Sequence, residues 1–282
     1  MAEGFDALVA RSHVLVTGGS SGIGLALAGA LARLGGHVHV AARRRPELDA
    51  ATAALRPLAR AGRTVTAHEC DVGSAESVAK LFEELRARGA EPSVVVNSAG
   101  VTVPGYFTAT SADDFDRIMR VNYMGTVLVA AQAVPGMIAR REGWLLNVGS
   151  LASLIGVYGM SAYCASKFAV RGLTESLRSE LKPHGIAVSL LCPPDTDTPM
   201  LAAERPLRPY ETEALSASAG VLSAEAVADA AIRGMRRREA VIVPGLEAKA
   251  TALAQRLVPG VAEGVADFIV RKARRAAELT KG

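Results

Sequence analysis

Cysteine is scarce in this chain of 282 residues, which has only Cys70, Cys164 and Cys192. Their spacing matches neither a disulfide framework nor a set of zinc ligands. We therefore expect no disulfide bond and no metal site. A reducing, cytoplasmic location fits this pattern best.

Long apolar runs and a strong net charge are also lacking. No uninterrupted apolar run approaches the ~20 residues of a membrane span, and the first residues lack the basic and apolar segments of a signal peptide. The net charge of +4 is slight, and the basic residues are mostly spread along the chain. We expect no nucleic-acid partner. We also expect a protein that is soluble or attached to a membrane only peripherally.

Aromatic residues make up only 4% of the chain, whereas 50% of it is apolar, with many alanine, valine, leucine and glycine residues. This composition is typical of helices packed closely on a buried parallel sheet. The length suits one large α/β domain and is short for two. We expect one domain over residues 1–245 and a helical tail over residues 246–282.

A glycine-rich loop follows the first predicted strand, at residues 13–16. It reads Thr-Gly-Gly-Ser-Ser-Gly-Ile-Gly over residues 17–24 and leads into an alanine- and leucine-rich helix. Strand, glycine loop and helix are what a dinucleotide site needs, because glycines let the backbone approach a pyrophosphate whose charge faces the helix N-terminus. The sequence therefore predicts a Rossmann-type, doubly wound parallel sheet flanked by helices. Seven strands are expected, the last at residues 240–243.

Three arginines follow the second predicted strand, at residues 37–41. Many dinucleotide folds place an acidic residue here to hold the ribose 2′-hydroxyl, whereas an arginine can pair with a 2′-phosphate. Arg43 therefore predicts NADPH/NADP+ as the cofactor. The role of Arg44 stays open, and Arg45 is expected only to begin a solvated helix.

Tyr163 and Lys167 are four residues apart on a predicted helix, so both side chains project from one face. A cation beside a phenol favours the phenolate and lowers its pKa from the usual value of about 10. Ser150, after the apolar segment 144–148, adds a second hydroxyl. A substrate carbonyl could accept a hydrogen bond from Ser150 and a proton from Tyr163. Taken alone, such a Tyr–Lys pair is more often an ordinary pair on an amphipathic helix.

With the glycine loop and Ser150, these residues resemble the short-chain dehydrogenase/reductase family over roughly residues 12–243. The resemblance implies a catalytic tetrad of Asn122, Ser150, Tyr163 and Lys167. It implies hydride transfer from NADPH to a ketone carbon, with Tyr163 as general acid, Lys167 on the nicotinamide ribose and Asn122 maintaining a water relay. It also implies a homodimer or homotetramer, because two long helices pair between subunits in many relatives.

The same resemblance places cofactor contacts at the ends of the strands. They are expected at Gly18, Ser20, Ser21, Gly22, Ile23, Gly24, Arg43, Asp71, Val72, Asn97, Ala99, Gly100, Tyr163, Lys167, Pro193, Thr196 and Thr198. Asp71 would lie beside the adenine and Thr198 beside the nicotinamide carboxamide. Asp71 or Ser74 could instead be an ordinary helix cap. Asn122 would lie in a helix over residues 112–140, with a bend or interruption near Pro135.

The turn Pro-Pro-Asp-Thr-Asp-Thr-Pro over residues 193–199 departs from the family's usual Pro-Gly form. It is similar to the turn of one branch of the family, the 3-ketodihydrosphingosine (3-ketosphinganine) reductases. That likeness predicts a long-chain, lipid-like ketone whose amine could meet Asp195 or Asp197, beneath a covering segment at residues 195–222. Two alternatives stay open: reduction of another ketone, such as a steroid, a fatty-acyl thioester or a small carbonyl, and a non-catalytic NADP(H)-sensing protein.

The tail contains two amphipathic stretches, residues 246–257 and 261–275. Three roles stay open for it: packing on its own core, a contact with a second subunit, or peripheral contact with a membrane surface. The third role would use Phe268, Ile269 and Val270 beside the cations of residues 271–275.

Overall fold

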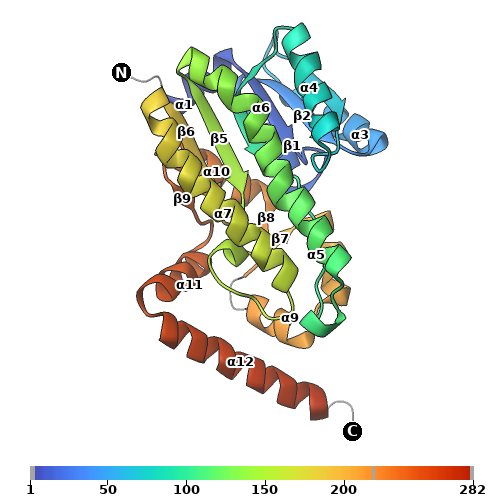
Figure 1. Cartoon of the computed structure of the whole chain (residues 1–282), viewed down its shortest axis with the longest axis vertical. Coiled ribbons are helices and arrows are strands. Elements are labelled where there is room, and N and C mark those ends of the chain that lie inside the picture. The colour runs from blue at the N-terminus through green and yellow to red at the C-terminus, as the bar shows by residue number, and fades with distance from the viewer. Residues whose placement is uncertain (1–3, 218–219, 280–282) are drawn as a thin grey trace.

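A seven-stranded parallel sheet lies between two layers of helices in the computed structural model, which describes residues 4–217 and 220–279 (Figure 1). The sheet order is β3-β2-β1-β4-β5-β6-β9, which confirms the predicted doubly wound fold. The strands are β1 (His13–Thr17), β2 (His37–Ala42), β3 (Val65–Glu69), β4 (Pro92–Asn97), β5 (Gly143–Val148), β6 (Ile186–Leu191) and β9 (Val241–Ile242). The predicted domain and tail also include residues 1–3 and 280–282, and the predicted covering segment includes residues 218–219; all of these lie outside the described residues.

Two apolar layers bury the sheet from both sides. One face is covered by α1 (Phe5–Arg11), α2 (Gly22–Leu34), α3 (Arg45–Leu55) and α10 (Ala224–Arg236). The other is covered by α4 (Ala75–Ala87), α6 (Gly125–Arg140) and α7 (Ser161–Leu181). The central strands β4 and β5 are buried along their whole length. This is why their sequences are nearly continuous apolar runs rather than alternating patterns.

The predicted helix over residues 112–140 is continuous but changes its winding. It consists of α5 (Ala112–Met119), a π-helical turn, η3 (Arg120–Met124), and α6. Pro135 lies inside α6 and does not interrupt it, so of the two predicted effects, a bend or an interruption, the interruption does not occur. Both Pro135 and Ala131, whose carbonyl loses its donor, are exposed, so water can replace the missing bond.

By length and composition, this helical run is the one stretch of the described residues that could cross a membrane. In the structure, α6 packs against the sheet and η3 carries Asn122 to the end of α7. We therefore describe the run as part of the Rossmann-type fold.

The segments beyond the sheet lie at the carboxyl ends of its strands (Figure 1). They include α8 (Pro199–Glu204), α9 (Tyr210–Ser216), α11 (Leu246–Leu257) and α12 (Pro259–Leu279), together with a short parallel pair, β7 (Thr196–Asp197) and β8 (Leu222–Ser223). Helix α12 packs beside α9. The tail therefore lies against the predicted covering segment.

Four histidines form a row across the first three strands. The imidazoles of His13, His39 and His68 are joined by nitrogen–nitrogen contacts of 3.0 and 2.9 Å, and His37 stacks on His13. A neutral imidazole can donate one hydrogen bond and accept one, so the row is satisfied only while its members are uncharged. Burial lowers the pKa of all four, and that of His39 to about 3.

Acid should therefore destabilise the protein through this row. An imidazole in the unfolded chain takes up its proton near pH 6.5, whereas His39 in the folded chain does so only near pH 3. Between these values the unfolded state binds more protons, so the free energy of unfolding decreases as the pH falls below about 6.5. We expect the urea midpoint to drop between about pH 7 and pH 5, in the window set by these pKa values.

His39→Gln should flatten this pH dependence, whatever its effect on stability at neutral pH. His184→Gln serves as the control because His184 lies outside the row. Equal pH slopes in the two variants and the wild type would contradict this explanation.

Candidate active site

The glycine loop between β1 and α2 is pressed against the end of β4. Gly18 has φ +64°, and a Cβ there would lie 2.8 Å from the Ala99 backbone. A Cβ on Gly24 would lie 2.2 Å from the Gly18 carbonyl oxygen. Only glycine fits both positions, and the loop leaves the start of α2 open to a cavity. This is the backbone cradle that a dinucleotide pyrophosphate requires.

A cavity of about 870 Å³ begins at this loop and extends to α12. The structure brings nearly every predicted cofactor contact to its wall: Gly18, Ser20, Ser21, Gly22, Ile23, Gly24, Arg43, Asp71, Val72, Ala99, Gly100, Tyr163, Lys167, Pro193, Thr196 and Thr198. Apart from Tyr163 and Lys167, which are on α7, these residues follow the ends of five strands, β1, β2, β3, β4 and β6, because parallel strands all end at the same edge of the sheet.

Asn97 is the predicted contact that the structure does not bring to the cavity. Its side chain is buried in the sheet, where Nδ2 donates to Oδ1 of Asn147 at 2.9 Å. Its neighbour Ser98 lines the cavity instead. Because successive side chains of a strand point to opposite faces of the sheet, the sequence could have indicated that Ser98, and not Asn97, faces the cavity.

The three arginines after β2 have different surroundings. Arg43 and Arg44 line the nucleotide end of the cavity, whereas Arg45 pairs with Asp49 on α3 at 3.0 Å. Arg44 is partly neutralised by Glu47, with Nε and Oε1 3.0 Å apart. In the described part of the chain no carboxylate pairs with Arg43, so its charge is free to meet an anion.

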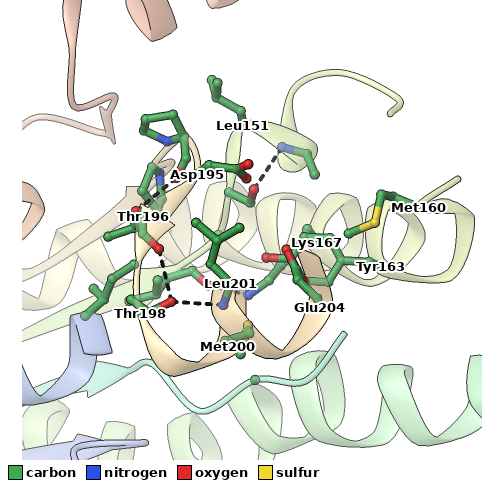
Figure 2. Close-up of a pocket in the computed structure, with 18 of the residues that line it drawn as sticks. Leu151, Met160, Tyr163, Lys167, Asp195, Thr196, Thr198, Met200, Leu201 and Glu204 are labelled. Carbon is green, nitrogen blue, oxygen red and sulfur yellow. Dashed lines mark hydrogen bonds between the residues drawn. The ribbon is translucent and has the colours of Figure 1, made fainter. Parts of the chain in front are cut away.

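Tyr163 and Lys167 project from α7 into the middle of the cavity, and Ser150 lies after β5 (Figure 2). The Lys167 ammonium lies 5.6 Å from the centre of the Tyr163 ring and donates to the Val148 carbonyl at 2.8 Å. The Ser150 hydroxyl accepts from the Ala152 amide at 3.1 Å, which holds it at the start of a short 3₁₀ helix, η4 (Leu151–Ser153). The predicted side chains therefore meet in one pocket.

The pKa of Tyr163 does not follow the sequence prediction. Burial raises it above its usual value, the nearby Glu204 carboxylate raises it further, and the hydrogen bond with Ser150 opposes them. Burial also lowers the pKa of Lys167 to about 8. Desolvation outweighs the expected effect of the cation, so Tyr163 is held as a neutral phenol that has a proton to give.

Asn122 lies behind the cavity wall rather than on it. Its amide nitrogen donates to the Val101 carbonyl and the Ser166 hydroxyl, at 3.0 and 2.9 Å, and its oxygen accepts from the Val101 amide at 2.8 Å. These bonds account for an asparagine within a helix, and the π turn that carries it is a form often found at functional sites. Asn122 ties the turn after β4 to the helix that bears Tyr163 and Lys167.

Sequence reasoning missed the far half of the cavity. Its wall includes the apolar residues Ala254, Val261, Ala262, Val265, Ala266 and Ile269 from α11 and α12. It also includes Glu204 and Arg208, joined by an ion pair. Their spacing of four residues was the available signal for that pair. The periodicity of the tail could not tell a cavity wall from an exposed face.

Comparison with known proteins identifies the family. Residues 12–208 match the family described as short chain dehydrogenase. The chain belongs to the short-chain dehydrogenase family. Short-chain dehydrogenases are oxidoreductases that act on a carbonyl or alcohol, so the enzyme class predicted from the tetrad is confirmed. Within the described residues, no group of three or more His, Cys, Asp and Glu side chains is arranged to hold a metal ion.

Two similar short-chain dehydrogenases are named for a sphingoid substrate. A 3-dehydrosphinganine reductase of Danio rerio is 37% identical over 79% of this chain and 68% of its own length. A 3-ketodihydrosphingosine reductase of Mus musculus is 34% identical over 77% of this chain and 66% of its own length. This chain thus spans about two thirds of the length of these relatives.

Among solved structures, a short-chain dehydrogenase from Sphingobium yanoikuyae in complex with NADPH is 30% identical, with a TM-score of 0.74. The match covers 90% of this chain and 94% of the other. It extends the likeness well beyond the 12–208 segment.

Tyr163→Phe should retain NADPH binding but lose turnover, because it removes a transferable proton and leaves the ring in place. General acid catalysis is worth on the order of 10²–10⁴-fold in rate, and kcat should fall by that amount. Lys167→Met should lose both binding and turnover. Cofactor binding is measured by fluorescence titration and turnover by NADPH oxidation.

Tyr158→Phe is the matched control, since Tyr158 is close in sequence but does not line the cavity. If Tyr163→Phe kept a near-normal kcat on a good substrate, the assignment of Tyr163 as the acid would be wrong.

Arg43→Ala should weaken NADPH selectively. A charge-assisted contact with phosphate is worth about 1.5–3 kcal/mol, which predicts an increase of roughly ten- to a hundredfold in the KM for NADPH. The KM for NADH should hardly change. Arg45→Ala is the control because Arg45 pairs with Asp49 and lies off the cavity. Equal losses for the two cofactors would refute the role of Arg43.

Proposed function

We propose that the protein is an NADPH-dependent ketone reductase that converts a long-chain 3-ketosphinganine to dihydrosphingosine. The observation that carries this proposal is a single cavity in which Ser150, Tyr163 and Lys167 stand between a nucleotide end and an apolar end. The names of the two sphingoid reductases support this substrate. The NADPH complex of the bacterial relative supports the cofactor.

The residues of the site divide the work of the reaction. The glycine loop and Arg43 would hold NADPH, which would supply the hydride for the ketone carbon. Ser150 donates a hydrogen bond to the carbonyl oxygen, and Tyr163 transfers its proton to that oxygen. The raised pKa of Tyr163 suits this direction, because the phenol is already protonated when the ketone arrives.

Lys167 and Asn122 keep the two reactants in place. Below its pKa of about 8, Lys167 is a cation, which would bind the nicotinamide ribose. Asn122 maintains the water relay. Its side chain also ties the turn at Val101 to Ser166 on α7. The complete tetrad supports an enzyme rather than a non-catalytic NADP(H) sensor, which would have no need of all four residues.

The apolar end suits a long hydrocarbon chain. Leu201 from α8 and Leu215 from α9 line the cavity together with the α12 side chains. We place the end of the catalytic domain at Gly245, with the helices beyond it as a tail that closes this end of the substrate site. A smaller ketone would leave much of this wall without a partner.

The dependence of kcat/KM on chain length tests the substrate. Each buried methylene is worth about 0.8 kcal/mol, so removing two carbons from 3-ketosphinganine should lower kcat/KM about tenfold. Steroid, acetoacetyl-thioester and small carbonyl substrates should be poorer. The measurement is NADPH oxidation on this panel. If kcat/KM did not depend on chain length, the protein would be a carbonyl reductase of another specificity.

We also propose that the tail makes peripheral contact with a membrane surface, where such a substrate is found. Exposed apolar side chains of α11 and α12 and of the turn between them that do not line the cavity support this: Leu246, Leu253, Leu257, Val258 and Phe268. Phe268 shares a small hollow with Arg271, Lys272 and Arg275, and each cation adds about 1 kcal/mol near an anionic surface. Unlike Phe268, Ile269 faces the substrate cavity, so it is not part of this surface.

A double substitution, Leu257→Glu with Phe268→Glu, should abolish co-sedimentation with anionic phospholipid vesicles, because both side chains are exposed and neither lines the cavity. Phe168→Glu, which changes an exposed apolar residue on α7, should leave it intact. Equal sedimentation of all three proteins would exclude the tail as the contact. Light scattering of the same samples tests the predicted dimer or tetramer.

A further inference from the structure

A buried cluster of charges forms the cavity wall beside the catalytic residues. The Arg208 side chain is 4% exposed and contacts both Asp195, in the turn after β6, and Glu204, at the end of α8. Its two terminal nitrogens bind the two oxygens of Asp195, one of them at 2.9 Å, and it also binds Glu204 Oε1. Arg208 thus links the turn after β6 to the end of α8.

The charges of this cluster do not balance. One guanidinium, that of Arg208, contacts two carboxylates that line the cavity, those of Asp195 and Glu204. A buried carboxylate is costly unless a cation or hydrogen bonds compensate it. The substrate end of the cavity therefore favours a cationic ligand.

Glu204 is the carboxylate best placed to meet that ligand. Asp195 has both oxygens committed to Arg208, and Asp197 does not line the cavity. Glu204 is only 8% exposed, yet its Oε2 makes no ion pair within the described part of the chain. Arg208 Nε, at the same point, is buried without a hydrogen-bond partner among the described residues. The cluster thus keeps one carboxylate oxygen outside any ion pair and, among the described residues, one buried donor without a partner.

Glu204 lies where its carboxylate could meet an amine on the carbon next to the reacting carbonyl. In Figure 2 its side chain extends from α8 toward Tyr163. The influence of its charge on the pKa of Tyr163 reflects the same proximity. In a 2-amino-3-ketone the amine is on the carbon adjacent to the ketone, so a carboxylate near the Tyr163 hydroxyl can reach it.

We propose that Glu204 is a specificity-determining residue that binds the protonated amine of the substrate, with Arg208 as the positioning residue that holds it. This proposal rests on the proposed function and adds which side chain recognises the amine of the substrate. The ammonium of the substrate donates to Glu204 while the carbonyl oxygen faces Ser150 and Tyr163. A long-chain ketone without the amine would leave Glu204 Oε2 without a cationic partner and would be a poorer substrate.

The test compares Glu204→Gln and the wild type on 3-ketosphinganine and on the same long-chain ketone without its amine. Loss of a charge-assisted bond should lower kcat/KM for the amine-bearing ketone about ten- to a hundredfold. For the amine-free ketone, kcat/KM should stay the same or rise. Equal losses on both ketones would make Glu204 only a structural residue and overturn the proposal.

Glu213→Gln is the matched control. Glu213 lies 3.6 Å from Arg208 but also pairs with Arg205 and does not line the cavity. Removing this charge should leave the preference for the amine unchanged. If Glu213→Gln abolished the preference as strongly as Glu204→Gln, the general charge of the cluster, and not Glu204, would be responsible.

A binding measurement separates this proposal from the proposed function. Calorimetry of the NADP+-loaded protein with a long-chain primary amine and with the matched alcohol needs no turnover. The wild type should bind the amine at least about tenfold more tightly, and Glu204→Gln should bind the two alike. This result would support the amine site even if the wild type reduced no ketosphinganine. Equal binding of amine and alcohol by the wild type would overturn it.

Discussion

All-parallel strand pairing is the constraint on which this structure depends. Parallel neighbours must be joined by crossover helices, so every strand of the sheet ends at the same edge. That edge gathers the glycine loop after β1, Arg43 after β2, Asp71 after β3, Ser98 after β4 and Ser150 after β5. Residues that are far apart in the sequence thus line one cavity.

The strands, the glycine loop and the Tyr163–Lys167 pair could be predicted because their signals are local. Apolar runs mark buried strands, and a spacing of four places two side chains on one helix face. The orientation of the Asn97 side chain into the sheet could have been predicted in the same way, because side chains alternate along a strand. The resemblance to the family's motif favoured a cofactor contact instead. The pKa of Tyr163 was not predictable, because it depends on how deeply the packed protein buries the phenol and on Glu204, 41 positions away in the sequence.

The role of the tail depended on tertiary contacts that periodicity does not encode. Both helices beyond Gly245 are amphipathic, and such a pattern fits a core, a partner or a membrane equally well. In the structure α12 packs beside α9, so that Ile269 and Val265 face the substrate cavity while Phe268 stays exposed. One helix therefore contributes both to the cavity wall and to the outer surface.

The two ends of the cavity have opposite electrostatic character, which would orient a substrate and a cofactor that share it. Arginines lie at the end with the glycine loop, which would hold an anionic cofactor, and carboxylates predominate at the proposed substrate end. A neutral Tyr163 and a cationic Lys167 stand between them. Charge and apolar length together would then place the ketone of an amphipathic, amine-bearing lipid at the point where hydride and proton arrive.

The most direct test of this account is a single-turnover reaction with NADPH that carries deuterium at both C4 positions. Mass spectrometry of the product locates the label. The account predicts one deuterium on the carbon that was the ketone of 3-ketosphinganine, with none on the neighbouring amine-bearing carbon. Dihydrosphingosine formed without deuterium at that carbon, or bound cofactor that yields no product, would contradict it.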